Sequence, residues 1–191
     1  MESLDQQIKR VTEEEIQIEP YNLAWPSMFK KEKEHLLFFL PNQLINRIEH
    51  FGSTAVPNLS AKPIIDMLVE VTSLDEVKKL IVPQLKSQGY DYFWRPMGNE
   101  DVPPYYAWFI KRDVNGNRTH HIHMVESDFS DWDRLHFKNY LIENPEIATD
   151  YQKLKIDLSN KYKNNRVEYT ERKGEFIRKY TKIAKLYYEK A

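Results

Sequence analysis

The order of hydrophobic and polar positions divides the chain into a mixed first part and a helical last part. In the first part, apolar runs of strand length end at turn-forming residues and predict strands over residues 44–51, 64–71, 90–94, 105–111 and 118–125. A helix is expected from Trp25 to Leu40, because Pro26 suits a first helical turn. Ser73 followed by Glu76 is typical of a capping box and predicts a helix over residues 74–87.

The last part of the chain predicts helices over residues 130–143, 145–163 and 166–190. One face of the final helix carries a stripe expected to pack into the core: Tyr169, Phe176, Ile177, Tyr180, Ile183, Ala184 and Tyr187. Residues 1–15 are interpreted as an acidic arm or a short frayed helix, and Ile16 and Ile18 as the start of an edge strand. We expect a single α/β (α+β) domain over residues 16–191, with a small mixed sheet flanked by helices and a helical C-terminal part.

Composition excludes several classes of protein. The chain has 191 residues, a formal net charge of -1 and no cysteine, which excludes disulfides and thiolate zinc sites. No apolar run has the length of a membrane span, and the N-terminus lacks the order of a signal peptide, so we expect a cytoplasmic protein. Residues 151–191 hold 12 lysines and arginines against 5 carboxylates. This basic excess is interpreted as a solvated helix face, with RNA as an alternative partner.

A glycine and two hydroxyl residues follow the first predicted strand. Gly52 allows the backbone to approach a ligand closely, because it has no Cβ. Ser53 and Thr54 offer hydroxyl and N–H groups to a phosphate, and Lys62 offers a positive charge. The alternative is an ordinary turn with a surface lysine, since the glycine and lysine spacing of a P-loop is absent.

Asp66 lies inside the apolar run of the second predicted strand. A buried charge is costly without a partner, and a metal ion is one such partner. Glu70 would lie too far along the strand to hold the same ion. Asp66 is therefore the candidate metal ligand, and Glu70 is interpreted as a solvent-exposed or ion-paired residue.

Three histidines lie on the fifth predicted strand. His121 and His123 share one face, because side chains alternate along a strand, and His120 points to the other face. Two histidines spaced in this way can grip one ion or bind phosphate. Arg118 precedes them and can neutralise phosphate charge. Each histidine taken alone is more typical of a half-exposed strand residue.

Four segments together resemble the GrpB family: HFGSTAVPNLSAKPIIDMLVEV, RTHHIHMV, the opening PYNLAWPSMF, and YLIENPEIATDYQKLK followed by YTERKGEFI. The similarity extends from about Ile16 to Ala184, and GSTAVP…AKPIID is its most specific part. The resemblance implies the fold of the DNA polymerase beta-like nucleotidyltransferases. In that superfamily a Gly-Ser pair faces an acid on the next strand, and Mg²⁺ supports nucleotidyl transfer from a nucleoside triphosphate.

The resemblance implies roles for Gly52, Ser53 and Asp66, with Ser53 and Asp66 as catalytic residues. The sequence departs from the superfamily at Leu68, where a second acid is usual, and from the family at Asn58, where glycine is usual. His121 and His123 would then complete the metal site, which favours Mn²⁺ or Zn²⁺ over Mg²⁺.

Three functions are consistent with this pattern. The first is a nucleotidyltransferase that binds a nucleoside triphosphate and a divalent metal, with an RNA or small-molecule acceptor. The second is a non-catalytic nucleotide- or RNA-associated module, which Leu68 favours. The third is a metal-dependent phosphohydrolase built on Asp66, His121 and His123.

Overall fold

The computed structural model describes residues 4–97 and 101–190. The chain forms two compact units. The sheet unit comprises Leu23–Ala55 and Ile64–Trp132, and the helical unit comprises Met1–Asn22, Val56–Pro63 and Asp133–Ala191. Each unit is described by itself.

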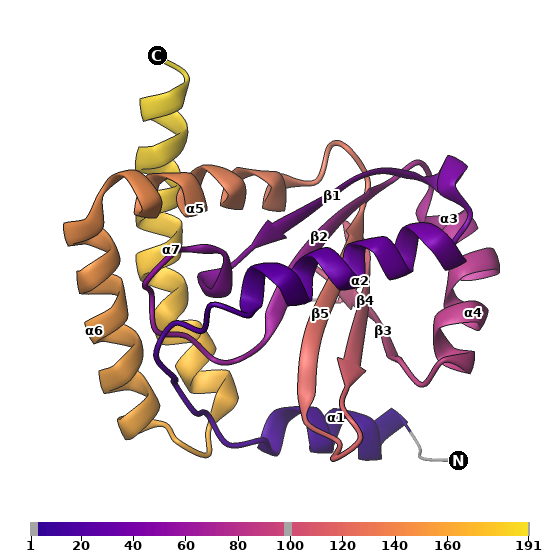
Figure 1. Cartoon of the computed structure of the whole chain (residues 1–191), viewed down its shortest axis with the longest axis horizontal. Helices are drawn as coiled ribbons and strands as arrows, with labels where there is room; N and C mark the ends of the chain where they lie inside the picture. The colour runs from indigo at the N-terminus through magenta and orange to yellow at the C-terminus, as the bar shows by residue number, and fades with distance from the viewer. Residues whose placement is uncertain (1–3, 98–100, 191) are drawn as a thin grey trace. The chain divides into compact units, whose positions relative to one another are not determined.

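The sheet unit is built on five strands in the order β1-β2-β5-β4-β3 (Figure 1). The strands are β1 (Ile45–Phe51), β2 (Ile65–Val71), β3 (Asp91–Pro96), β4 (Tyr105–Arg112) and β5 (Arg118–Val125). β2 and β5 are parallel, and every other neighbouring pair is antiparallel. The expected small mixed sheet is therefore confirmed, and β2 and β5 are its central parallel pair.

One side of the sheet, here called the helix face, is covered by helix α2 (Trp25–Phe39) (Figure 1). The Phe29 ring stacks on His50 of β1 with centroids 4.8 Å apart. Lys33 donates a hydrogen bond to the Ile48 carbonyl. The opposite side, here called the site face, carries Asp66, because side chains alternate along each strand.

The segment between β2 and β3 also packs on the helix face. It comprises α3 (Leu74–Glu76), a π-helical stretch (Val77–Ile81) and α4 (Val82–Ser87). Ser73 caps it as expected, because its hydroxyl accepts the Glu76 N–H at 3.3 Å. The single helix expected here is thus real but contains a π-helical turn.

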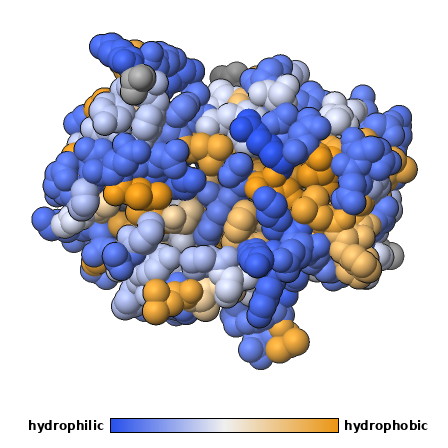
Figure 2. All heavy atoms as spheres, turned by 45° about the horizontal axis from the view of Figure 1, so that its top comes forward, coloured by the Kyte–Doolittle hydropathy of each residue, from blue (hydrophilic) through white to orange (hydrophobic). Residues whose placement is uncertain are grey.

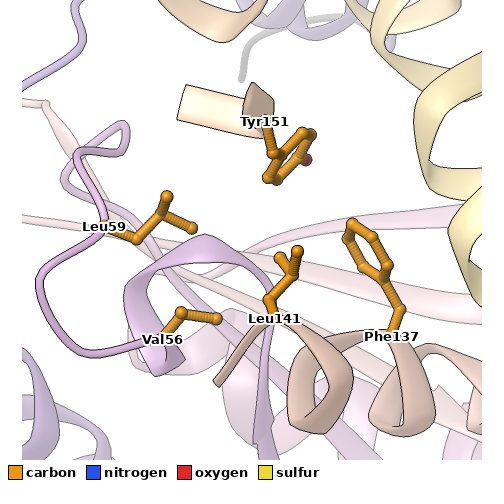
Figure 3. Close-up of a cluster of buried hydrophobic side chains, with 5 residues drawn as sticks. All are labelled: Val56, Leu59, Phe137, Leu141 and Tyr151. Atoms are coloured by element: carbon orange, nitrogen blue, oxygen red, sulfur yellow. The ribbon is translucent and has the colours of Figure 1, made fainter. Parts of the chain in front are cut away.

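The helical unit contains α1 (Leu4–Glu13), α5 (Asp133–Glu143), α6 (Pro145–Lys161) and α7 (Arg166–Tyr188). Its core joins the loop after β1 to α5 and α6, as the close-up in Figure 3 shows, through Val56, Leu59, Phe137, Leu141 and Tyr151. Phe176, Ile177 and Tyr180 of α7 pack against this cluster. A second cluster comprises Ile16, Leu158 and Tyr169.

Several elements differ from the expectations. Ile16 and Ile18 form no strand, and an isolated bridge joins Glu19 to Ala61 instead. Ile16 is used as a core residue, so its apolar character reflects packing and not sheet pairing. β3 continues to Pro96, two residues beyond the strand predicted over residues 90–94, and residues 98–100 after it lie outside the described residues.

The apolar stripe of α7 is only partly buried. Tyr169 and Ala184 are buried, whereas Ile183 and Tyr187 are 38% and 53% exposed. On the surface drawn in Figure 2, hydrophilic residues predominate and hydrophobic ones gather in separate patches. Among the described residues, no helix is long and apolar enough to span a membrane.

Candidate metal centre

Asp66, His121 and His123 meet on the site face because of the register of two strands. β2 and β5 run parallel, with Asp66 opposite His121 and Leu68 opposite His123. One potential ligand atom from each of the three residues lies within 4.8 Å of the other two. An ion at about 2.1 Å from each donor spans at most about 4.2 Å between donors. A small side-chain rotation therefore suffices for the three residues to hold one ion.

The three side chains differ in exposure. The Asp66 side chain is 31% exposed and that of His121 is 11% exposed. The Asp66 carboxylate oxygen Oδ1 lies 3.2 Å from His121 Nδ1. Two imidazole nitrogens and one carboxylate oxygen suit Mn²⁺, Fe²⁺ or Zn²⁺ better than Mg²⁺, which prefers oxygen ligands.

Arg118 lies beside the His121 ring. Its Nη1 lies 3.4 Å from His121 Nε2, and the arginine is 6% exposed. A guanidinium can only donate, so His121 Nε2 is the acceptor of this contact. Arg118 thus orients the ring and places a positive charge beside the site. That charge favours an ion that arrives with an anionic ligand.

Gly52 lies against Asp66. Its φ of +77° is in the left-handed region, and a Cβ at this position would overlap the Asp66 carboxylate, with the Cβ and Cγ of Asp66 only 3.0 Å away. Phe51, just before it, pairs with Asp66 in the sheet. The glycine is therefore required both by the turn and by the close approach of the acid.

The two hydroxyl residues after Gly52 have different surroundings. Ser53 is partly exposed, and within the described residues its hydroxyl makes no hydrogen bond. Thr54 is 1% exposed, and its hydroxyl donates to the Ile64 carbonyl at 3.1 Å. His50 Nε2 lies 3.0 Å from the same hydroxyl and therefore donates to it. Thr54 holds the turn together, so we leave it out of the proposed ligand contacts.

Lys62 belongs to the helical unit, so we assign it no part in this site. Its ammonium nitrogen lies 5.3 Å from the centroid of the Tyr169 ring. Glu70, as expected, is an ion-pair partner, with its Oε2 at 2.7 Å from Nε of Arg47. The structure thus brings together Gly52, Asp66, Arg118, His121 and His123.

Comparison with known proteins identifies the family. Residues 15–183 match the family model described as GrpB protein. The chain belongs to the GrpB family. It is 35% identical to the glutamate-rich protein GrpB of Alkalihalophilus pseudofirmus over 168 residues, which are 87% of this chain and 94% of that protein. It is 38% identical to YqkA of Bacillus subtilis, over 85% of this chain but only 45% of YqkA.

A solved structure supports the same assignment. The crystal structure of the GrpB protein from Enterococcus faecalis superposes with a TM-score of 0.76 at 35% sequence identity. The match covers 90% of this chain and 99% of that one. The expected GrpB resemblance is confirmed, and the fold of this GrpB-family chain is a mixed five-stranded sheet with helices.

Sequence reasoning missed the aromatic surroundings of the two histidines. The ring centroids of Phe51 and Tyr106 each lie 5.4 Å from that of His123. The Trp108 ring lies 5.1 Å from that of His121, edge to face. Tyr106 and Trp108 lie on β4, which pairs antiparallel with β5, so their rings stand beside those of the two histidines.

Proposed function

We propose that this protein binds the phosphate groups of a nucleoside triphosphate at one divalent transition-metal ion and transfers the nucleotidyl group to an acceptor. The proposal rests on the convergence of Asp66, His121 and His123. The family resemblance to the nucleotidyltransferases adds the reaction class. A bound ion would supply charge neutralisation and polarisation of the phosphoryl oxygens.

The protein's own groups would position the phosphates around that ion. Ser53 follows the Gly52 turn beside Asp66 and has a hydroxyl to donate. Arg118 contributes positive charge from the other side of His121. In the reaction, an acceptor oxygen forms a bond to the α-phosphorus while the bond to the bridging oxygen breaks. Pyrophosphate leaves, and the acceptor's proton passes to water.

Leu68 favours the use of a single ion. It stands on the site face opposite His123, where the superfamily usually has a second acid, and it is fully buried. Two-metal chemistry needs several oxygen ligands around hard cations. We therefore expect Mn²⁺ or Zn²⁺ to bind more tightly than Mg²⁺.

The test is calorimetric titration with Mn²⁺, Zn²⁺ and Mg²⁺, followed by the four nucleoside triphosphates in the tightest metal. Asp66→Ala and His123→Ala should each weaken metal binding by at least about tenfold. His120→Gln is a matched control, because His120 lies on the same strand but points to the helix face. Unchanged metal affinity in Asp66→Ala, or binding of no nucleotide by the wild type, would contradict the proposal.

A second candidate function is metal-dependent phosphate ester hydrolysis. The single carboxylate and two imidazoles favour it, because this donor set is typical of one ion with open positions. The two candidates differ in the attacking group, which is water in hydrolysis and an acceptor in transfer. Release of phosphate from simple esters without any acceptor supports hydrolysis, whereas release of pyrophosphate only with an acceptor supports transfer. Nucleotide binding without either product would indicate a non-catalytic module.

A further inference from the structure

A second group of side chains lies on the site face, one and two strands away from the histidines. Trp108 of β4 stands opposite His123, and Tyr106 of β4 stands opposite Arg95 of β3. Paired residues share a face, so these side chains continue the surface that begins at Asp66. All of them belong to the sheet unit.

The side chains of this group contact one another and the histidines. The Tyr106 ring stacks on His123 with an interplanar angle of 17°. The Trp108 ring centroid lies 6.1 Å from that of His123, and the Arg95 guanidinium carbon lies 5.0 Å from the Trp108 centroid. An aromatic surface topped by a cation therefore extends from the candidate metal centre to β3.

Two donors on this surface have no acceptor or ion-pair partner among the described residues. Trp108 is 7% exposed, and its buried Nε1–H has no hydrogen-bond partner among the described residues. Leaving a buried donor unsatisfied destabilises the fold, so a ligand acceptor here would be favourable. Arg95 is exposed and forms no ion pair within residues 4–97 and 101–190. Its guanidinium lies over the indole, so its movement toward a ligand would uncover the ring.

We propose that Arg95, Tyr106 and Trp108 form the base-binding subsite of the nucleotide and that this subsite prefers guanine. Stacking on aromatic rings and arginine is a common mode of base binding. Arg95 and Trp108 offer donors only. Guanine presents two acceptors, O6 and N7, on one edge, whereas adenine presents one acceptor beside a donor amino group. The proposal rests on the proposed function and adds the nucleotide class.

The spacing fits a nucleotide whose phosphates lie at the candidate metal centre. Neighbouring strands are about 4.8 Å apart, so β3 lies about 10 Å from β5. A ribose and base attached to a phosphate near His123 would therefore reach past Trp108 toward Arg95.

The experiment measures GTP and ATP affinity with Mn²⁺ in the wild type and in variants. The wild type should bind GTP at least about tenfold more tightly than ATP, because guanine accepts one more hydrogen bond from the charged Arg95 than adenine does. Arg95→Ala should remove most of this preference, and Arg95→Lys should restore it only in part, because lysine lacks the planar fork. Trp108→Phe keeps a ring but removes the N–H, and should weaken GTP binding several-fold.

A matched cation–aromatic contact on the helix face, between the π-helical stretch and β3, provides the controls. The Lys78 ammonium nitrogen lies 3.4 Å from the centroid of the Trp94 ring, and Trp94 points to the helix face. Lys78→Ala and Trp94→Phe should leave both nucleotide affinities unchanged. Binding of Mn²⁺ alone should be the same in the wild type, in both Arg95 variants and in the two controls.

The outcomes separate this subsite from the proposed function. Equal affinity for GTP and ATP in the wild type, or GTP affinity unchanged in both Arg95→Ala and Trp108→Phe, overturns the subsite while the metal-bound nucleotide stands. Binding of no nucleotide overturns both. A wild-type preference for GTP, with GTP affinity that falls in Arg95→Ala and Trp108→Phe and is unchanged in Lys78→Ala and Trp94→Phe, supports the subsite.

Discussion

Two acids on opposite sides of the sheet have very different surroundings. One lies on the helix that covers the helix face, and the other lies on the site face itself. Glu32 of α2 is 3% exposed beneath the helix face, where its Oε1 accepts the Tyr90 hydroxyl at 2.5 Å and its Oε2 pairs with Lys111. Asp66 on the site face keeps 31% of its side chain exposed and lies beside His121. The first acid has a cationic partner and a buried hydroxyl, which is the pattern of a structural ion pair. The second is open to a ligand.

The histidines of β5 follow the same division. His120 points to the helix face, where burial lowers its pKa and the nearby Lys111 acts in the same direction, while Glu32 opposes them. His121 and His123 point to the site face beside Asp66. Neighbouring residues of the same type on one strand are thus assigned to packing or to chemistry by the alternation of the strand alone.

The largest expected effect is that of removing the structural acid. Glu32→Ala leaves the Tyr90 hydroxyl and the Lys111 ammonium without their partner, so the free energy of unfolding should fall by about 3–5 kcal/mol. Urea denaturation measures this loss of stability. Glu34→Ala is the control, because Glu34 is exposed on the same helix. A loss below about 1 kcal/mol would mean that the helix face does not depend on this pair.

A buried lysine that has no ion-pair partner among the described residues sharpens the comparison. Lys155 of α6 is 2% exposed, donates to the Ser60 carbonyl, and lies beside the Tyr151 ring. Burial, together with the charge of Lys173, lowers its pKa to about 7. The unfolded chain then binds the extra proton between pH 7 and about 10.5, so the stability contributed by this group rises with pH through that window.

Within this pH window, the free energy of unfolding contributed by Lys155 should rise by about 1 kcal/mol per pH unit. Urea denaturation of the wild type and of Lys155→Met at pH 7, 8 and 9 measures it, because the variant removes this titration and keeps the others. The stability of the wild type relative to the variant should increase with pH. A constant difference would mean that Lys155 stays protonated, with its charge compensated.

The glycine beside Asp66 tests how closely the site is built. Gly52→Ala should lower the free energy of unfolding by about 2 kcal/mol or more, since a left-handed residue with a Cβ is strained and here also overlaps Asp66. Gly116→Ala separates the backbone strain from the overlap with Asp66. Gly116 has a φ of +83° and open space around it, so that variant carries only the strain of about 1 kcal/mol.

Gly52→Ala should also weaken metal binding, whereas Gly116→Ala should not. Calorimetric titration with Mn²⁺ measures this difference. If both variants bind the ion equally well, the carboxylate does not need its present position, and the role of Gly52 is confined to the turn.

The sequence predicted the fold better than it predicted the neighbours of the site. The strand at residues 118–125 and the alternation of His120 with His121 and His123 follow from local pattern, and both are confirmed. That β2 lies parallel to β5 with Asp66 opposite His121 is a matter of topology, which local pattern does not encode. Lys62 belongs to the other compact unit, so its contact with phosphate stays a prediction.

The hydrogen bonds of buried polar groups were the second feature of the site that the sequence did not predict. Thr54 was predicted to contact phosphate through the hydroxyl and N–H groups of its turn; its hydroxyl bonds the Ile64 carbonyl, and the contact stays a prediction. A hydroxyl in a turn satisfies backbone groups as readily as ligands, and only the three-dimensional structure tells the two apart. The prediction that Asp66, His121 and His123 bind a metal remains a prediction, now with their proximity to support it.

The smallest change in stability is expected when Asp66, the acid of the site, is replaced. Asp66→Asn keeps the shape of the side chain and its ability to accept the His121 N–H, so the free energy of unfolding should change by less than about 1 kcal/mol. Metal binding should nevertheless fall, because the negative charge is lost. Asp91→Asn is the matched comparison, since Asp91 pairs with Arg112 at 2.9 Å and both side chains are 14% exposed.

Asp91→Asn should cost more stability than Asp66→Asn and leave metal binding intact, as urea denaturation and calorimetric titration would measure. The reverse order would identify Asp66 as a structural ion-pair partner of His121, and the metal centre would then lose its carboxylate. Stability and affinity measured on the same two variants therefore decide whether the exposed acid on the site face serves the fold or a ligand.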